Sequence, residues 1–239
     1  MRAVIDLDRA IARAQEHLLS RQAPDGHWVG ELEADSTITS EHVLFCHLID
    51  RVNHERERKA VAYLRLRQQP DGGWNLFEGG PSDLSATVKA YFAMKMAGVS
   101  PEDPAMVRAR ARIRALGGPT KANVFTKILL ALFGEYDWNG VPTMPVEMAL
   151  LPRRFYFDIY EVSYWSRTVM MPLLVLMDRK PVKFLPADRS LDEIWPRPRE
   201  QASLRFPRRP HPWSLRALFW KNLFIAVDDM SNSLGCYGH

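Results

Sequence analysis

One eleven-residue pattern occurs twice in the chain, and it limits the possible folds more than any other feature. Leu18–Trp28 reads LLSRQAPDGHW and Leu64–Trp74 reads LRLRQQPDGGW, so both copies fit L-x3-Q-x3-G-x-W around a Pro-Asp-Gly turn. The two copies lie 46 residues apart. Since a period of this length suits stacked pairs of helices, the repeat predicts an all-α fold of the α/α toroid or solenoid kind.

The repeat is interpreted as structural. In each copy a helix ends near the glutamine, the Pro-Asp-Gly turn reverses the chain, and the tryptophan packs beside the turn. The glutamine amide is expected to bond backbone groups left free at the next helix start, and the indole to stack on the amide. The candidate structural residues are Gln22, Gly26 and Trp28 in the first copy and Gln68, Gly72 and Trp74 in the second.

Helical periodicity extends through most of the chain. Leu7, Ile11, Ala14 and Leu18 share one face of a first helix, with Asp6 or Asp8 as its N-cap. No run alternates apolar and polar residues between hairpin turns, which favours an all-α chain. Further helices are expected over residues 40–50, 55–68, 84–97, 104–116, 123–133 and 159–177, the last one kinked or interrupted at Pro172.

Composition excludes several classes of function. The chain has 239 residues, 46% of them hydrophobic, and a net charge of +4. Its basic residues are mixed with acidic residues along most of the chain, which does not favour nucleic-acid binding. Cys46 and Cys236 cannot build a disulfide framework, and no Cys/His cluster has zinc-site spacing. The longest apolar run, residues 169–177, is far shorter than the roughly 20 residues that span a bilayer. The start lacks a secretory signal, so we expect a cytoplasmic protein or one attached to a membrane surface.

The repeat resembles the QW motif of triterpene cyclases, and the segments around it resemble the N-terminal part of bacterial squalene–hopene cyclases. The resemblance is almost continuous from Asp8 to about Asp229. The segments that carry it include Glu41-His-Val-Leu-Phe-Cys-His, Gly79-Gly-Pro-Ser-Asp-Leu-Ser-Ala-Thr, Ile159-Tyr-Glu-Val-Ser-Tyr-Trp-Ser-Arg and Trp220-Lys-Asn-Leu-Phe.

The resemblance implies a fold and an activity. These enzymes hold squalene or a related linear isoprenoid in an apolar cavity between two α-barrel domains. They are isomerases (intramolecular transferases) of hopanoid biosynthesis, in which a protonated aspartate starts a polycyclisation to hopene or hopanol, and aromatic faces stabilise the cation. The resemblance implies no metal or organic cofactor, a place on the inner face of the bacterial plasma membrane, and a homodimer for the full-length family.

Five substrate-binding candidates follow from the resemblance alone. Trp165 and Phe125 match aromatic residues that line the cavity, and Glu41 matches a polar residue near the proton donor. Val162 and Met170 match the constriction of the substrate channel. The alternative is that the apolar residues among them are ordinary core residues and Glu41 a solvated helix residue. No role is assigned to Lys89, where some relatives have an acid.

The chain departs from the family in one respect that bears on catalysis. It has no D-x-D-D motif: Asp6-Leu-Asp8 lacks the third acid, and Asp228-Asp229 follows Ala226-Val227. A carboxylic acid that protonates an alkene needs partner groups to tune it. We therefore predict no catalytic residue in this chain and no cyclase activity for it alone, with a C-terminal cyclase domain as the missing partner.

The predicted organisation follows from these interpretations. Residues 1–12 are expected to pack on the missing catalytic domain, and 13–180 to form the α/α-barrel domain with both repeats. Residues 181–213 contain seven prolines and seven Lys or Arg residues and are expected to form an extended connection over the surface. A helix is expected over 214–229, and an unrelated, disordered tail over 230–239.

Two other functions remain open. The chain could be a stand-alone, non-catalytic α/α domain that binds isoprenoid or membrane, with Trp195, Phe206 and Trp213 of the basic segment resting on anionic lipid. A solvated connector is the simpler explanation of that segment. A protein prenyltransferase subunit would need a zinc site, for which Cys46 and His47 lack a third ligand.

Overall fold

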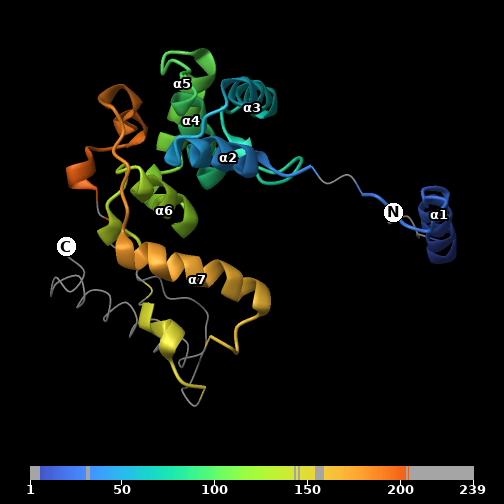
Figure 1. Cartoon of the computed structure of the whole chain (residues 1–239). Helices are drawn as coiled ribbons and strands as arrows, with labels where there is room; N and C mark the ends of the chain where they lie inside the picture. The colour runs from blue at the N-terminus through green and yellow to red at the C-terminus, as the bar shows by residue number, and fades with distance from the viewer. Residues whose placement is uncertain are drawn as a thin grey trace. The chain divides into compact units, whose positions relative to one another are not determined.

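The computed structural model describes residues 6–30, 33–142, 144, 146–153, 159–202 and 204. The chain divides into two compact units, Met1–Ala34 and Asp35–His239. Helices dominate the described part of both units, as the sequence predicts, and the described 3-10 turns all lie after α5 (Figure 1). The predicted helix at 214–229 and the predicted tail at 230–239 lie outside the described residues.

The first unit consists of helix α1 (Leu7–Ser20) and the first repeat. The Asp6 side chain accepts a hydrogen bond from the Arg9 amide at 3.3 Å and thereby caps the helix. Leu7, Ile11 and Leu18 form an apolar face, yet α1 has no buried residue. The domain boundary predicted between residues 12 and 13 falls inside this helix.

The second unit contains the remaining α-helices. Asp or Asn side chains cap the first five of them and Ser163 caps the sixth, which explains where each begins. The cap at Asp35 starts one helix four residues before the predicted residue 40, and the cap at Ser163 starts another five residues after the predicted 159. The helices are α2 (Ser36–Leu48), α3 (His54–Arg67), α4 (Leu84–Met96), α5 (Pro104–Ala115), α6 (Val124–Leu132) and α7 (Tyr164–Arg179).

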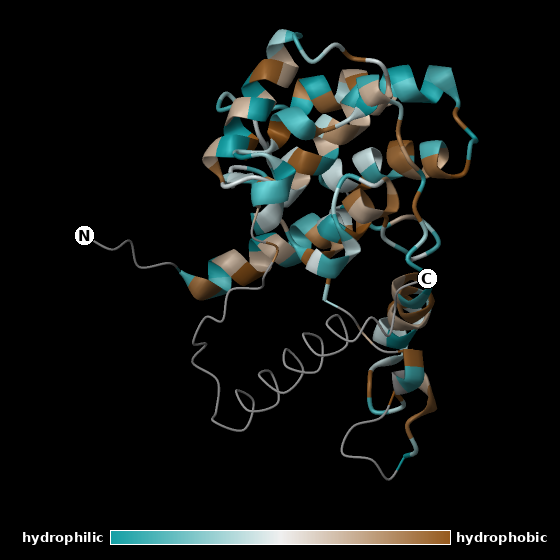
Figure 2. Ribbon diagram, turned by 90° about the vertical axis from the view of Figure 1, so that its left-hand side faces the viewer, coloured by the Kyte–Doolittle hydropathy of each residue, from teal (hydrophilic) through white to brown (hydrophobic). Residues whose placement is uncertain are grey.

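Helix α4 forms the centre of this unit, with α2, α3, α5 and α6 packed around it. Every residue of α4 from Ser85 to Met96 is buried. Phe92 of α4 packs edge to face against Phe133, which follows α6, with ring centroids 5.1 Å apart. Figure 2 shows apolar and polar residues, in brown and teal, on the same helices.

Short elements connect these helices. Strands β1 (Trp74–Asn75) and β2 (Ser82–Asp83) form a small antiparallel pair in which Trp74 faces Asp83. The 3-10 turns are η1 (Pro119–Lys121), η2 (Trp138–Gly140), η3 (Val146–Leu150), η4 (Ala187–Arg189), η5 (Asp192–Ile194) and η6 (Arg199–Gln201).

The connection after α7 differs from the prediction. It was expected to run extended over the surface, but Leu191, Ile194 and Trp195 are buried in the core of the second unit. Trp195 stacks on Tyr136 with centroids 5.8 Å apart, and Pro196 contacts Gly118 closely enough to leave no room for a side chain there. Since burial of large apolar side chains is a main source of folding free energy, residues 181–202 belong to the fold rather than to a linker.

Candidate functional site

The two repeats make the same local hydrogen bonds. Gln22 donates from Nε2 to the Gly26 carbonyl at 2.7 Å, and Gln68 does so to the Gly72 carbonyl at 2.9 Å. The indole Nε1 of each tryptophan donates to the carbonyl of the leucine ten residues earlier, at 2.6 Å for Trp28 and 2.9 Å for Trp74. Both glycines have positive φ, +91° and +88°, which favours glycine at these positions. The motif therefore specifies one turn geometry twice.

The second repeat also holds another helix. Gln68 Nε2 donates to the Ala105 carbonyl in the first turn of α5 at 2.8 Å, and Gln68 Oε1 accepts from Arg108 at 2.8 Å. The sequence predicted a bond from the glutamine to the free backbone groups at the start of the next helix, which is α4. Gln68 bonds instead to a carbonyl in the first turn of α5, whereas the free groups at a helix start are N–H donors. Gly72 lies so close to α5 that a Cβ atom there would be 2.6 Å from the Arg108 carbonyl group.

The five substrate-binding candidates lie on three elements. Glu41 is on α2 and Phe125 on α6, whereas Trp165 and Met170 are in the N-terminal half of α7 and Val162 just precedes it. Trp165 is 75% exposed and Phe125 is 57% exposed, so the structure excludes them from the core of the described residues. Val162 and Met170 are half-buried. Both candidate aromatic rings thus lie on the surface, on different helices.

Glu41 forms an ion pair that sequence reasoning missed. Lys89 on α4 is buried, and its Nζ lies 2.5 Å from Glu41 Oε1. A buried ammonium needs an anionic partner, and Glu41 supplies it. On α2, Glu41 stands between exposed Ile38 and Phe45, so this carboxylate interrupts an apolar stripe. The helical spacing of Ile38, Glu41, Phe45 and Ile49 could have revealed that stripe, but no local signal identifies Lys89 as the partner.

A buried polar network joins the segment after α7 to α4. Tyr91 donates its hydroxyl to Glu193 Oε1 at 2.7 Å, and Lys95 bonds both Glu193 and the Ser190 carbonyl. Burial alone would raise the pKa of Glu193, but the hydrogen bonds from Lys95 and Tyr91 outweigh it and lower that pKa. Burial, and then the neighbouring Glu193, raises the pKa of Tyr91. The carboxylate is therefore held in its charged form.

Basic residues of this segment also satisfy the carbonyl ends of three helices. Lys183 Nζ donates to the His47 and Leu48 carbonyls at the end of α2, at 2.8 and 3.4 Å. Arg189 donates to the last carbonyls of α4, and Arg199 donates to the Gly134 carbonyl just past α6 at 3.4 Å. Cations are favourable at helix C-termini, where carbonyls lack partners. Three of the four basic residues of 181–202 thus have a structural role, and the fourth, Arg197, is exposed.

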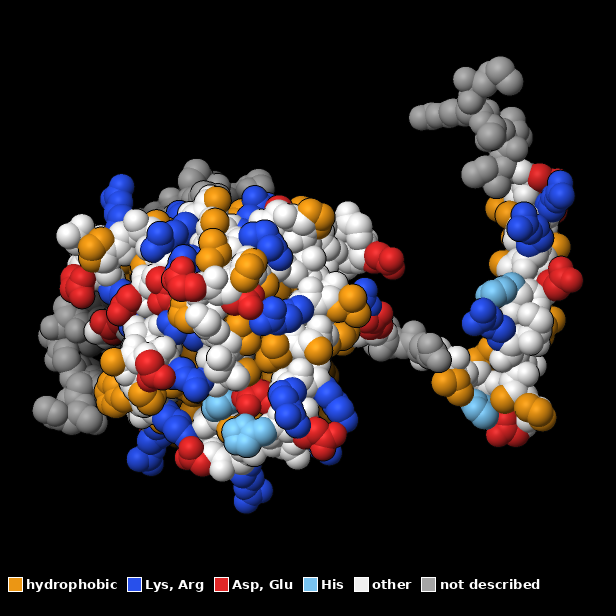
Figure 3. All heavy atoms as spheres, turned by 90° about the horizontal axis from the view of Figure 1, so that it is seen from above, with side chains coloured by type: hydrophobic (Ala, Val, Ile, Leu, Met, Phe, Trp, Pro, Cys, Tyr) orange, Lys and Arg blue, Asp and Glu red, His pale blue; other side chains and the backbone are white. Residues whose placement is uncertain are grey.

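Charged side chains of both signs are mixed on the part of the described surface that Figure 3 shows. Figure 3 views the molecule from above, onto α3 and α5, and Lys and Arg side chains lie interspersed with Asp and Glu on this face. Among the described residues no His, Cys, Asp and Glu group is arranged to hold a metal ion. Cys46 Sγ lies 3.7 Å from His42, whereas His47 Nε2 lies 2.5 Å from Glu57. None of the described helices has both the length and the apolar composition needed to cross a bilayer.

Comparison with known proteins confirms the resemblance. The family model described as squalene-hopene cyclase N-terminal domain matches residues 11–236, a range that includes much of the predicted unrelated tail. The squalene–hopene cyclase of Zymomonas mobilis is 53% identical over 178 residues, which cover 74% of this chain and 27% of that protein. A probable squalene–hopene cyclase of Sinorhizobium fredii is 43% identical over 224 residues, covering 93% and 34%.

A relative that is named for a different product matches this chain over a similar number of residues. The dammaradiene synthase of Dryopteris crassirhizoma is 41% identical over 222 residues, which cover 93% of this chain and 31% of that protein. The chain spans about a third of the length of these relatives, from 27% to 34%. The extent of the family match and the level of identity show that the chain belongs to the squalene–hopene cyclase family, where it corresponds to the N-terminal domain.

Proposed function

We propose that this chain forms one wall of the substrate cavity of a squalene–hopene cyclase-like enzyme. In this proposal the rest of the enzyme supplies the D-x-D-D acid, and the complete enzyme converts squalene or a related linear isoprenoid to hopene or hopanol. The observation that carries the proposal is the exposure of Trp165 and Phe125, at 75% and 57%, in a chain of this family. Large exposed aromatic side chains commonly mark a surface that another element or a ligand covers.

The exposed aromatic rings suit the chemistry proposed. A polycyclisation moves positive charge along an apolar substrate, and ring faces stabilise a cation without reacting with it. Glu41 would contribute a carboxylate near the proton donor, already held by Lys89 at 2.5 Å. Val162 and Met170, both half-buried, would narrow the path by which substrate enters. The proposal requires no metal or organic cofactor.

The first repeat supports a second part of the proposal. Its glutamine and tryptophan have the same internal bonds as those of the second repeat, but Trp28 is 50% exposed where Trp74 is 1% exposed. In the second repeat Gln68 also bonds to the first turn of α5, and Trp74 is in contact with α4 through Thr87. We infer that residues 6–30, like the predicted segment 1–12, pack on a helix start in the catalytic part of the complete enzyme.

The arrangement of the complete enzyme extends the proposal. The helices of the second unit would form part of an α/α toroid, since α4 is surrounded by four other helices. Because the proposed substrate is apolar, it would reach the cavity from the inner face of the plasma membrane, to which the enzyme would bind peripherally. A homodimer of the complete enzyme belongs to the same proposal.

The stand-alone lipid-binding alternative has less support. It depended on the basic segment and on Trp195, Phe206 and Trp213. Trp195 is buried, and Lys183, Arg189 and Arg199 are engaged with helix ends. Phe206 and Trp213 lie outside the described residues.

A hybrid enzyme tests the proposal. This chain would replace the matching N-terminal part of the Zymomonas mobilis cyclase, and squalene conversion would be measured for the hybrid and for the chain alone. We expect hopene or hopanol from the hybrid and none from the chain alone. In the hybrid, Trp165→Ala should reduce turnover by at least about tenfold, since a cation–π contact in a dry cavity contributes about 2 kcal/mol.

Phe77→Ala serves as the matched control because Phe77 is an exposed aromatic residue, at 66%, that the resemblance does not place in the cavity. It should leave turnover of the hybrid unchanged. Product from the chain alone would contradict the proposal, and so would a folded Trp165→Ala hybrid with full activity.

A further inference from the structure

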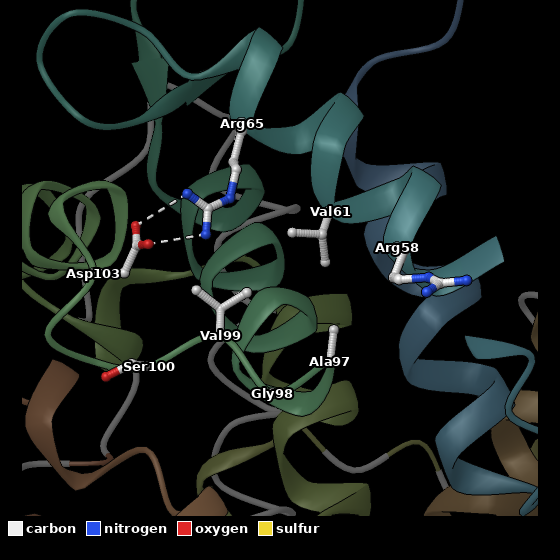
Figure 4. Close-up of a pocket in the computed structure, with 8 residues that line it drawn as sticks. All are labelled: Arg58, Val61, Arg65, Ala97, Gly98, Val99, Ser100 and Asp103. Atoms are coloured by element: carbon white, nitrogen blue, oxygen red, sulfur yellow. Dashed lines mark hydrogen bonds and ion pairs between the residues drawn. The ribbon is translucent and has the colours of Figure 1, made fainter. Parts of the chain in front are cut away.

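A groove between α3 and the turn from α4 to α5 is not explained by the cyclase proposal. Its volume is about 400 Å³, within the range of pockets that take small ligands. Figure 4 shows its lining: Arg58, Val61 and Arg65 come from α3, and Ala97, Gly98, Val99, Ser100 and Asp103 from the turn. The groove lies in the second unit and includes none of the five cavity candidates.

One end of the groove is polar but electrically balanced. Arg65 donates to both carboxylate oxygens of Asp103, at 3.4 and 2.9 Å (Figure 4). Asp103 also accepts from the Ala105 amide at 2.9 Å as the cap of α5. Arg65 neutralises the charge of Asp103, and the Ala105 amide helps to fix the position of the carboxylate. This ion pair therefore bounds the groove and would not attract a charged ligand.

The opposite end of the groove carries an unbalanced positive charge. Arg58 precedes Arg65 by two helical turns on the same side of α3, with Val61 between them (Figure 4). Arg58 is exposed, and within the described part of the chain no acidic side chain pairs with it. Its guanidinium is therefore free to accept a carboxylate or phosphate group.

The stretch between the two ends is apolar and open. Val61, Ala97 and Val99 face one another across it (Figure 4). At Gly98, which has φ of +88°, a Cβ atom would meet no other atom within 4 Å, so the wall there is bare backbone next to free space. A short alkyl chain would cover these apolar side chains without displacing the hydrogen bonds between Arg65 and Asp103.

We propose that this groove binds an anionic amphiphile, with the anionic group at Arg58 and the apolar chain along Val61, Ala97 and Val99. The unpaired charge of Arg58 suits the anionic group of such a ligand, and the apolar stretch beside it suits the alkyl chain. The ion pair of Arg65 and Asp103 bounds the other end of the groove. A fatty acid or an alkyl phosphate has this chemistry, and an acidic lipid in a membrane presents the same groups. The proposal is independent of the cyclase function.

Titration of the full chain with decanoate, below its micelle concentration, tests the proposal. We expect saturable binding, followed by calorimetry. Arg58→Gln should weaken it at least about tenfold, because a charge-assisted contact contributes about 1.4 kcal/mol or more. Ala97→Phe should also abolish binding by filling the groove, and neither change removes a hydrogen bond of the described fold. Decanol, which lacks the charge, should bind at least tenfold more weakly, by the same contribution of about 1.4 kcal/mol.

Arg56→Gln is the matched control, because Arg56 is an exposed arginine of α3 that does not line the groove. It should leave decanoate binding within about twofold of the parent chain, as expected for a surface substitution. Circular dichroism would verify the fold of each variant. Decanoate binding that Arg58→Gln and Ala97→Phe leave intact would overturn the proposal, and so would an equal loss in Arg56→Gln or the lack of saturable binding.

Vesicles distinguish the two sources of ligand. If a membrane lipid is the ligand, Arg58→Gln and Ala97→Phe should reduce flotation with phosphatidylglycerol vesicles as well as decanoate binding. If the ligand is a soluble amphiphile, the two variants should affect decanoate binding alone.

Discussion

The two copies of the repeat differ in their surroundings although their internal geometry is the same. Both have a glutamine bonded to the turn glycine, a tryptophan bonded to the preceding helix and a glycine with φ near +90°. In the second copy Gln68 also bonds to the first turn of α5, whereas Gln22 of the first copy bonds, among the described residues, only within its own turn. The comparison teaches that eleven residues are enough to specify the turn, whereas the burial of its tryptophan depends on a helix from elsewhere in the sequence.

The tryptophans should show the largest difference between the copies. Trp74 is 1% exposed and donates to the Leu64 carbonyl at 2.9 Å. Trp74→Ala should lower the free energy of unfolding by about 3–5 kcal/mol through the cavity it leaves. Trp28→Ala, at a 50% exposed site, should lower it by less than about 1 kcal/mol. Urea denaturation of both variants measures this, and equal losses would show that the two copies are packed alike.

The glycines should show the next largest difference. Alanine at either position must adopt a positive φ, which costs about 1–2 kcal/mol. Only at Gly72 would the new Cβ also lie 2.6 Å from the Arg108 carbonyl, which adds about 1–3 kcal/mol of overpacking. Gly72→Ala should therefore destabilise the chain clearly more than Gly26→Ala does. A larger effect at Gly26 in thermal unfolding would contradict the close contact with α5.

The glutamines test the bond to α5 directly. Gln68→Ala removes the bonds to Gly72 and Ala105 and leaves Arg108 without its acceptor, for a loss of about 1–2 kcal/mol. Gln22→Ala removes one exposed bond and should cost about 0.5 kcal/mol. A double variant with Arg108→Ala should lose less than the sum of the two single changes, because both residues share one contact. Additive losses would mean that they act independently.

The turn aspartates extend the comparison to pH. Burial would raise the pKa of Asp71, but hydrogen bonds from Ser82 and the Gly73 amide, with the charge of Arg112, outweigh it and lower that pKa below the ordinary 3.8. A lowered pKa contributes stability above about pH 4 that is lost as the pH falls through the folded-state value. Because the Asp71 side chain is 41% exposed, solvent screening limits this to a few tenths of a kcal/mol.

Asp71→Asn should therefore reduce the loss of stability between about pH 5 and pH 2, measured by urea denaturation at each pH. Asp25→Asn is the matched change in the first copy, where the aspartate is 72% exposed and pairs, among the described residues, with His27 alone. It should leave the acid limb of the stability curve unchanged. If Asp71→Asn did not change the loss of stability at low pH, the hydrogen bonds of this turn would be excluded as a cause of that loss.

Local signals in the sequence predicted much of the fold. Helix α5 begins at Pro104, as that proline predicted, and the repeat predicted both turns, because in each case the deciding contacts lie within a few residues. The burial of Trp195 and the bond from Arg189 to the Lys95 carbonyl were not predicted. Those partners are far apart in sequence, 94 residues for Arg189 and Lys95, and proline-rich basic composition favours a surface linker.

The candidate site was predictable to a smaller extent. The resemblance identified Glu41, Phe125 and Trp165, and the structure adds that both rings are exposed and that Glu41 pairs with Lys89. Lys89 is 48 residues from Glu41 in the sequence. A lysine in a predicted core helix gives no indication of which acid it meets, so this pair needed the structure.

Hydrogen–deuterium exchange on the two repeats tests the central claim most directly. In the chain alone, the amides of residues 18–28 should exchange much faster than those of residues 64–74, because exposed local structure opens at little cost in free energy. In the hybrid with the Zymomonas mobilis cyclase, residues 18–28 should become as protected as residues 64–74. Equal protection of the two repeats in the chain alone would contradict the claim that the first repeat is completed by the rest of a longer enzyme.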